Sequence, residues 1–278
     1  QVYANDEEYS LINTDVVEGE GIRALDITDV AAVKAFCEEI KPYAIINCAA
    51  FTNVDACETN RDTAFKINAI GPRNLAIAAK EAGAKLLHVS TDYVFPGTEA
   101  SPRTEFDAVG PKSMYGTTKL AGENFVKEFG DKYFIIRTAW LYGDGKNFVR
   151  TMLTIAKTHD VVSVVDDQIG SPTSAMELAG AIKALLTTDN YGLFHGTCEG
   201  VCSWADFTEE IFRLAKVNTK VEHISSETYK ERFPQSADRP KYSVLDNYMF
   251  RISSDIRFKD WKDAIAEYIA GGLVDDLL

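Results

Sequence analysis

The sequence predicts an α/β fold, a doubly wound parallel sheet followed by a smaller C-terminal domain. Short apolar runs of strand length alternate along the chain with segments whose apolar residues recur every three to four positions. These short runs are continuously apolar, as in parallel strands that helices cover on both faces. The chain has 278 residues, of which 46% are hydrophobic, and this is enough for a large core and two lobes.

The first half of the chain carries the regular alternation. Within the helical segment 29–40, Val30, Val33 and Phe36 recur at a spacing of three, and we expect Thr28 to cap this helix. Together these elements predict a first domain over residues 1–145. The expected strands lie at 9–15, 44–48, 85–90 and 133–138, and the expected helices at 29–40, 63–82 and 113–129.

The second half has a looser pattern and predicts a second domain over residues 146–278, with some chain crossing between the two lobes. Ser203 and Asp206 have the spacing of a capping box, which places a helix start at Ser203. The other expected elements are helices at 148–158, 175–186 and 259–270 and strands at 161–165 and 192–195.

Composition excludes several classes of protein. The net charge of −13 repels phosphate backbones and anionic lipid, so we expect no nucleic-acid or membrane-surface partner. No apolar run reaches the roughly 20 residues of a membrane helix. The five cysteines are an odd number, and Cys198 and Cys202 are separated by three residues, which is not a zinc-binding spacing. We therefore expect buried free thiols, no metal site and a cytoplasmic protein.

Tyr115 and Lys119 form the first candidate for chemistry. Residues four apart on a helix share one face, and a lysine charge about 4 Å away lowers a tyrosine pKa by roughly three units at an effective dielectric near 20. Such a pair exchanges protons with a carbonyl near neutral pH. The alternative is a plain surface pair. Tyr142 and Lys146 repeat the spacing, but the glycines of YGDGK disfavour a helix there.

Two further motifs follow expected strands. The segment 90–95 (STDYVF) places hydroxyl groups where parallel strands form a ligand crevice, or these groups bond only a turning backbone. The segment 47–50 (NCAA) offers small side chains that let a ligand approach the backbone. Tight packing of a helix on the sheet would explain the same small residues.

The order of these motifs resembles the extended short-chain dehydrogenase/reductase superfamily, which has a Rossmann-like fold, and within it the dTDP-4-dehydrorhamnose reductase family. The resemblance covers nearly the whole chain from about residue 24. The blocks that carry it are ALDITD (24–29), INCAAFTNVDACE (46–58), KINAIGPRNLA (66–76), STDYVFPG (90–97), YGTTKLAGE (115–123), RTAWLYG (137–143), DQIGSPT (167–173) and RPKYSVLDN (239–247).

The resemblance implies a nucleotide-cofactor-binding domain at 1–145 and a mainly substrate-binding domain at 146–278. It implies reduction of the C4 ketone of dTDP-4-dehydro-6-deoxy-L-mannose with NADPH or NADH, in nucleotide-sugar and cell-surface polysaccharide biosynthesis. By motif, Tyr115 is the proton donor, Lys119 lowers its pKa and holds the nicotinamide ribose, and Thr91 bonds the substrate carbonyl. The implied cofactor contacts are Asp26, Ile27, Ala49, Ala50, Tyr115 and Lys119, and the implied substrate contacts are Val54, Thr91, Tyr93, Tyr115, Trp140, Asn147 and Arg239.

Several of these residues have a second interpretation from the residues alone. Asn147 either opens a helix toward a diphosphate or serves as a simple helix cap. Arg239 either binds the diphosphate through a bidentate contact or forms a surface ion pair. Trp140 either packs on the deoxysugar or belongs to the core. Gln168 matches a family position, but the sequence gives it no physical role.

The sequence departs from the family pattern at two places. The first strand and glycine-rich turn have no counterpart, so the first βα unit of the fold is missing from the sequence. Either that unit precedes Gln1 or the chain is a fragment, and the intact remaining motifs favour the first. Met176 stands where some members place a magnesium-bridging glutamate, with Glu177 one residue later. We therefore expect a monomer or a weak homodimer.

Two other functions fit the same motifs. One is a non-catalytic, cofactor-binding regulatory subunit, like that of methionine adenosyltransferase, which shares the fold. The other is a different nucleotide-sugar reductase or epimerase of the same superfamily.

Overall fold

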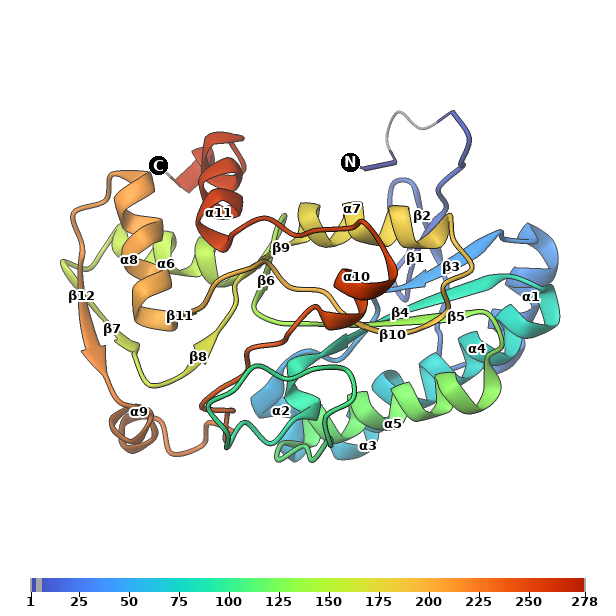
Figure 1. Cartoon of the computed structure of the whole chain (residues 1–278), viewed down its shortest axis with the longest axis horizontal. Helices are drawn as coiled ribbons and strands as arrows, with labels where there is room; N and C mark the ends of the chain where they lie inside the picture. Colours follow the sequence, from blue (N-terminus) through green and yellow to red (C-terminus); the bar gives the residue numbers. More distant parts are fainter. Residues whose placement is uncertain (1, 4–6, 278) are drawn as a thin grey trace. The chain divides into compact units, whose positions relative to one another are not determined.

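The computed structural model describes residues 2–3 and 7–277 (Figure 1). Two compact units are each assembled from separate segments of the chain. Unit 1 comprises Gln1–Val94, Val109–Arg137 and Ile182–Phe194, and unit 2 comprises Phe95–Ala108, Thr138–Ala181 and His195–Leu278. The expected division at residue 145 separates a cofactor-binding domain from a mainly substrate-binding domain. It is defined by ligand and not by compactness, and it stays a prediction.

Unit 1 is built on a four-stranded sheet. Its order is β10 (Gly192–His195), β5 (Tyr133–Thr138), β4 (Lys85–Thr91) and β3 (Ala44–Asn47). Strands β3 and β4 are parallel, with Asn47 opposite His88. Strands β4 and β5 are buried almost throughout, which explains the apolar runs Leu86–Leu87 and Phe134–Ile136 within them.

Helices cover both faces of this sheet, as the sequence predicts for a doubly wound fold. Helices α1 (Val30–Ile40), α4 (Gly71–Ala82) and α5 (Met114–Phe129) share a core with β4 and β5 that includes Val33, Leu75, Leu86, Val126 and Ile135. The end of α7 (Ala175–Leu186) lies on the opposite face (Figure 1). Its last carbonyl, that of Leu186, accepts a 3.0 Å hydrogen bond from Lys85 Nζ.

The structure corrects the N-terminal part of the prediction. Only Asn13–Asp15 of the expected strand 9–15 is extended, as β1, and it pairs in parallel with the unexpected β2 (Ile22–Ala24). Both strands are exposed and form a separate two-stranded sheet. Asp29, not Thr28, caps α1, because its side chain accepts hydrogen bonds from the Ala31 and Ala32 amides.

The expected long helix 63–82 is divided. It consists of α3 (Arg61–Phe65), a π-helical turn at Lys66–Ile70 and α4, and the short helix α2 (Val54–Thr59) precedes it. π-Helical turns occur mostly within helices and often at functional sites. This one carries Asn68, whose side chain is fully buried.

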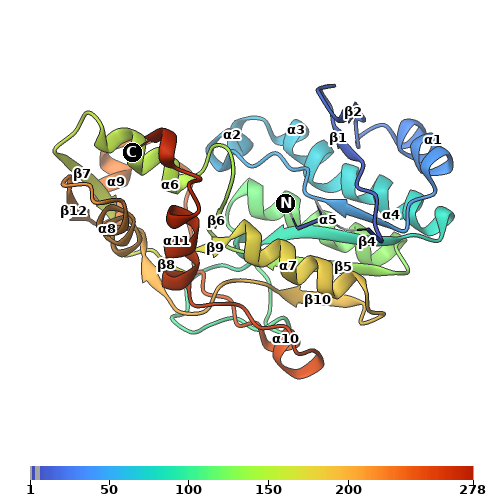
Figure 2. The same cartoon turned by 90° about the horizontal axis from the view of Figure 1, so that it is seen from above.

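Unit 2 consists of three short strand pairs and helices around an aromatic core. The pairs are β7 (Val161–Val165) with β12 (Lys220–Ile224), β6 (Leu141–Tyr142) with β9 (Thr173–Ser174), and β8 (Ile169–Gly170) with β11 (Cys202–Ser203). Figure 2 shows α6 (Phe148–Ala156), α8 (Trp204–Ala215) and α11 (Trp261–Ala270) gathered together. The predicted capping box of Ser203 and Asp206 is confirmed. Two short helices complete the unit, α9 (Ser226–Arg232) and α10 (Tyr248–Ser253).

Two sequence expectations concern the surface. None of the helices in residues 2–3 and 7–277 is long and apolar enough to span a bilayer. All five cysteines are free, and four of them are buried, but Cys48 is exposed. Cys48 follows the last residue of β3, where the chain leaves the covered part of the sheet, so its expected burial is wrong.

Candidate active site

Helix α5 brings Tyr115 and Lys119 to the end of β4. Ser113 caps the helix by accepting a hydrogen bond from the Gly116 amide. A Cβ atom at Gly116 would lie 2.2 Å from the carbonyl oxygen of Tyr93, so only glycine permits this approach. The first turn of α5 therefore lies directly against the segment that follows β4.

Thr91 is the residue of β4 that meets Tyr115. The two side chains share a hydrogen bond. The Thr91 hydroxyl donates a 2.9 Å hydrogen bond to Asp92 Oδ1 and accepts one from the Tyr93 amide at 3.2 Å. The Tyr93 and Tyr115 rings meet edge to face with centroids 5.5 Å apart. Three residues of the predicted site are thus in mutual contact.

Lys119 lies on the same face of α5, one turn further along. Its side chain is buried, and Nζ donates a 2.7 Å hydrogen bond to the carbonyl oxygen of Val89. Burial lowers its pKa to about 8, and the charge of Glu123 and the Cys48 thiol oppose this shift. The buried Lys119 amine therefore still carries its proton at neutral pH.

The electrostatics of Tyr115 differ from the expectation. Burial raises the pKa of its hydroxyl, Asp92 raises it further, and the hydrogen bond with Thr91 lowers it. The predicted lowering of this pKa by Lys119 is wrong in this structure, because desolvation outweighs the attraction of a lysine that bonds Val89 instead. Tyr115 is a protonated acid throughout the neutral range.

Two buried asparagines hold the segment that follows β3. Asn47 bonds His88 Nδ1 at 3.0 Å and accepts a hydrogen bond from the Ala49 amide at 3.1 Å. Asn68 accepts from the Phe51 amide at 2.7 Å and donates to the Phe51 carbonyl and to Thr118 Oγ1, each at 3.1 Å. Our sequence analysis missed Asn68, although a polar residue inside an otherwise helical segment was the available signal.

Small side chains leave this segment accessible. Ala49 is exposed and Ala50 is half-buried, directly after the carboxyl end of β3. In doubly wound folds, ligands bind outside the carboxyl ends of the strands. The pair therefore fits a nucleotide cofactor that lies along the edge of the sheet.

The remaining predicted residues of unit 1 have local partners. Asp26 is exposed, and its side chain accepts a 2.8 Å hydrogen bond from the Thr28 amide. Ile27 belongs to the core, and a Cβ atom at Gly71 would meet its Cδ1 atom at 2.4 Å. Val54 is the first residue of α2 and is half-buried. No arrangement of these three side chains identifies a ligand.

In unit 2, Trp140 is part of an aromatic cluster. Its ring stacks on that of Trp204 with centroids 3.5 Å apart and an interplanar angle of 8°. Phe148 packs against Trp204 with centroids 4.4 Å apart. Trp140 remains half-buried, so this arrangement supports the core interpretation and leaves part of the indole accessible.

The structure shows where the three polar residues Asn147, Arg239 and Gln168 of unit 2 lie. Asn147 caps α6 through its bond from the Arg150 amide and also donates to the Gly143 carbonyl at 2.5 Å. Arg239 is exposed in the segment before α10. Gln168, which had no role from sequence, donates a 2.9 Å hydrogen bond to Ser226 Oγ at the start of α9.

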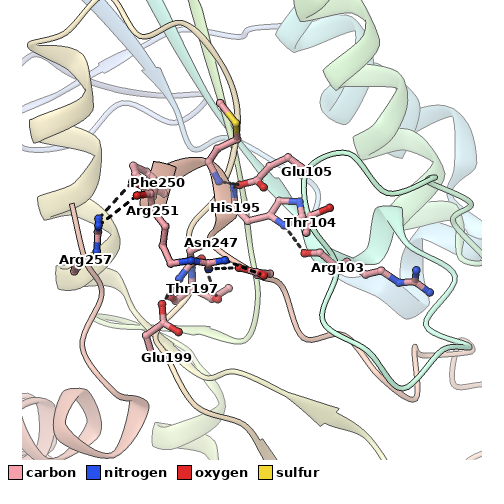
Figure 3. A network of polar contacts seen from close by, with 12 residues as sticks. Arg103, Thr104, Glu105, His195, Thr197, Glu199, Asn247, Phe250, Arg251 and Arg257 are labelled. Atoms are coloured by element: carbon pink, nitrogen blue, oxygen red, sulfur yellow. Dashed lines mark hydrogen bonds and ion pairs between the residues drawn. The ribbon is translucent and has the colours of Figure 1, made fainter. Parts of the chain in front are cut away.

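A buried network anchors the segment 244–249 that follows Arg239 (Figure 3). Glu105 Oε1 accepts hydrogen bonds from the amides of His195, at 2.7 Å, and Met249, at 3.2 Å. Asn247 bonds the backbone of Thr197 through both its carbonyl and its amino group. Burial raises the pKa of Glu105, which favours its protonated form.

Met176 stands where some family members place a magnesium-bridging glutamate, and Glu177 is the next residue. Met176 is 45% exposed, whereas Glu177 lies 3.2 Å from Lys259 Nζ. Glu177 therefore forms an ion pair inside its own chain.

The doubly wound sheet, the contact between Thr91 and Tyr115, and the position of Lys119 one turn further along α5 define the chain as an oxidoreductase of the short-chain dehydrogenase/reductase class. The family model "RmlD substrate binding domain" matches residues 4–273. The chain belongs to this family.

Relatives and solved structures agree with this assignment. The chain is 41% identical over 251 residues to a dTDP-4-dehydrorhamnose reductase of Streptomyces griseus, covering 87% of this chain and 81% of the relative. It is similar to the crystal structure of a dTDP-4-dehydrorhamnose reductase from Clostridium acetobutylicum, with 52% identity, a TM-score of 0.85 and 91% of each chain covered. A second such structure, from Bacillus anthracis in complex with NADP, has 42% identity, a TM-score of 0.85 and 90% of each chain covered.

Proposed function

We propose that this chain is a dTDP-4-dehydrorhamnose reductase, which reduces the C4 ketone of dTDP-4-dehydro-6-deoxy-L-mannose to dTDP-L-rhamnose with NADPH or NADH. The observation that carries the proposal is the contact between Thr91 and Tyr115 with Lys119 one turn away on the same helix face. Family membership and the named relatives support the choice of substrate. The Bacillus anthracis structure, in complex with NADP, supports the choice of cofactor.

The residues perform the proton half of the reduction. Thr91 binds the substrate carbonyl oxygen and holds it beside the Tyr115 hydroxyl. When bound, the reduced nicotinamide supplies the hydride to C4. Tyr115, which is protonated at neutral pH, donates its proton to the oxygen. Lys119, one turn further along α5, would stabilise the tyrosinate once the bound substrate and cofactor draw its ammonium away from Val89.

The cofactor contacts remain proposals. Ala49 and Ala50 would lie along the cofactor, because their small side chains leave the backbone at the end of β3 accessible. Tyr115 and Lys119 would hold the nicotinamide ribose. Asp26 would meet the adenine, with Ile27 contributing mainly through its backbone because its side chain fills the core.

The substrate contacts are proposed within each unit separately. Val54, Thr91, Tyr93 and Tyr115 would contact the sugar from unit 1. In unit 2, Arg239 is exposed, as a diphosphate ligand must be in the free protein. Trp140 would contact the substrate in addition to packing in the aromatic cluster, and Asn147 would contact it in addition to capping α6.

Oxidation of NADPH or NADH, followed by absorbance, tests this function directly. Saturable turnover with the dTDP-4-keto sugar is expected. Cofactor binding without turnover on any 4-keto nucleotide sugar would favour the regulatory-subunit alternative. Faster turnover of another nucleotide sugar would favour a different reductase or epimerase of the superfamily.

We also propose that the protein works in the cytoplasm as a monomer or weak homodimer. The free cysteines suit a reducing compartment. The ion pair of Glu177 with Lys259 supports an assembly that does not use this carboxylate.

A further inference from the structure

Glu123 continues the face of α5 that carries the candidate catalytic residues. Tyr115, Lys119 and Glu123 are spaced by four, so each lies one turn beyond the last on one side of the helix. The side chain of Glu123 is completely buried. A buried carboxylate on this face needs a partner, because an isolated charge is costly to desolvate.

Arg137 of β5 supplies that partner. Its Nε donates to Glu123 Oε1 at 2.9 Å and its Nη2 to Oε2 at 2.7 Å, which makes a bidentate ion pair. The Arg137 side chain is itself only 2% exposed. The bidentate contact compensates the buried charge of the Glu123 carboxylate inside the unit.

Glu123 also bonds the strand that carries Thr91. The hydroxyl of Ser90, the residue before Thr91, donates a 2.6 Å hydrogen bond to Glu123 Oε1. One carboxylate therefore ties together β4, α5 and β5. Because Thr91 and Tyr115 lie on two of these elements, the tie fixes the distance between their hydroxyl groups.

The charge of Glu123 acts on Lys119. The titratable groups around this lysine are Glu123 and Tyr115 on α5, His88 on β4 and Cys48 after β3. The Glu123 carboxylate is itself flanked by Arg137 and by Lys127, whose Nζ lies 3.6 Å from Oε2. Burial and the Lys119 charge lower the pKa of His88, so it is neutral. Neighbouring protein atoms desolvate the Cys48 thiol and the Tyr115 hydroxyl and raise both pKa values, so both groups are protonated. Of these four groups, Glu123 alone is a carboxylate, and it is paired with Arg137.

We propose that Glu123 is a positioning residue for the reduction, which fixes Thr91 through Ser90 and places a carboxylate one helical turn from the buried Lys119 ammonium. Its part in the reaction rests on the proposed function, whereas the charge coupling is a property of the chain alone. A purely structural tie would require the hydrogen bonds of Glu123 but not its charge.

The coupling is measured by titrating Lys119 in the whole chain, labelled with ¹³C at lysine Cε and assigned with Lys119→Arg. The wild-type midpoint is expected near pH 8. Glu123→Gln should lower the midpoint by about one unit or more, since it removes the charge and keeps the shape. Ser90→Ala is the matched control, because it removes a hydrogen bond to Glu123 but not the charge, and its midpoint should stay at the wild-type value.

If Glu123→Gln does not fold, the double variant Glu123→Met with Arg137→Met replaces the buried ion pair by apolar groups, a change that is often tolerated. The Lys119 midpoint should still fall, because Glu123 lies on the same helix face as Lys119, but by less than in Glu123→Gln, since the positive charge of Arg137 is lost as well. A Lys119 midpoint equal to that of the wild type in the folded charge-removing variant would overturn the proposal.

Kinetics separate the two halves of the proposal. The alkaline limb of kcat/KM should move to lower pH in Glu123→Gln together with the Lys119 midpoint. Ser90→Ala should lower kcat without moving the limb. If the alkaline limb of kcat/KM stays at the same pH in Glu123→Gln, Glu123 has only a structural role. If the wild type shows no turnover, the proposed function fails, while the titration still decides the coupling.

Discussion

Gly170 lies against the face of the Trp140 indole, since a Cβ atom at Gly170 would lie 2.4 Å from Cε2 and 2.7 Å from both Cζ2 and Nε1. These three distances place the added atom above the ring rather than at its edge. Trp204 stacks on the same ring at 3.5 Å, and there is no room for both on one side. The indole is therefore held between Gly170 and Trp204, with its backbone in the left-handed region at φ +49°.

Trp140→Ala should lower the free energy of unfolding by about 2–4 kcal/mol, because the indole is covered on both faces by its own unit. A substrate contact would add a several-fold rise in KM. Trp204→Ala is the matched control, because it disrupts the same stack without removing the proposed contact. Urea unfolding and steady-state kinetics of both variants separate the two roles. A destabilised Trp140→Ala with an unchanged KM would make this residue part of the core alone.

Tyr115→Phe should lower kcat by about 10²–10⁴-fold, the usual contribution of a general acid, with little change in substrate affinity. Tyr142→Phe provides the control. The Tyr142 hydroxyl is buried and has no hydrogen-bond partner among the described residues, so its removal should change kcat less than twofold and leave stability intact. Retention of most of the kcat in Tyr115→Phe, with chemistry limiting turnover, would contradict the role of this residue.

Lys119→Met should stabilise the protein at pH 7 while abolishing activity. Folding lowers the pKa of Lys119 from 10.5 to about 8, so the buried charge costs roughly 3 kcal/mol below pH 8. Between pH 8 and 10.5 the folded lysine has lost its proton and the unfolded one has not, so this cost disappears as the pH rises. The stability difference between Lys119→Met and the wild type, measured in urea, should therefore shrink across that window. A stability difference that stays constant across this pH range would show that burial does not destabilise the Lys119 charge.

Glu105→Gln tests the buried network of unit 2. Folding raises the pKa of Glu105 above its ordinary value of 4.5. The stability gained from the protonated carboxyl is therefore complete at low pH and is lost as the pH rises through the raised pKa. The amide of glutamine keeps the acceptor for the His195 and Met249 amides without a charge. The variant should gain stability relative to the wild type from pH 4.5 upward, and parallel pH profiles would contradict the assignment.

The doubly wound sheet was predictable because its strands are buried on both faces. Strands β5 and β10 of this sheet coincide with the expected ranges 133–138 and 192–195. The exposed strands β1 and β2 have no such boundary, which explains the wrong extent of the first and the omission of the second. The π-helical turn was not predictable, because it lies between the two helices α3 and α4 and its residues are themselves typical of a helix.

The candidate site was predictable only as a set of residues. The spacing of Tyr115 and Lys119 placed them on one helix face, and the structure brings Thr91 to Tyr115. The pKa values were not predictable from spacing, because they depend on burial and on partners far along the chain. Gln168 gained its role in the same way, from Ser226, which lies 58 residues later.

The most direct test of the proposed function is to follow the hydride itself. The protein would be incubated with dTDP-4-dehydro-6-deoxy-L-mannose and with NADPH or NADH carrying deuterium at the transferable position of the nicotinamide. Mass spectrometry and NMR of the product should show one deuterium at C4 of dTDP-L-rhamnose, and Tyr115→Phe should form this product about 10²–10⁴-fold more slowly. Unlabelled substrate recovered with intact cofactor, from protein shown to bind both, would contradict the account.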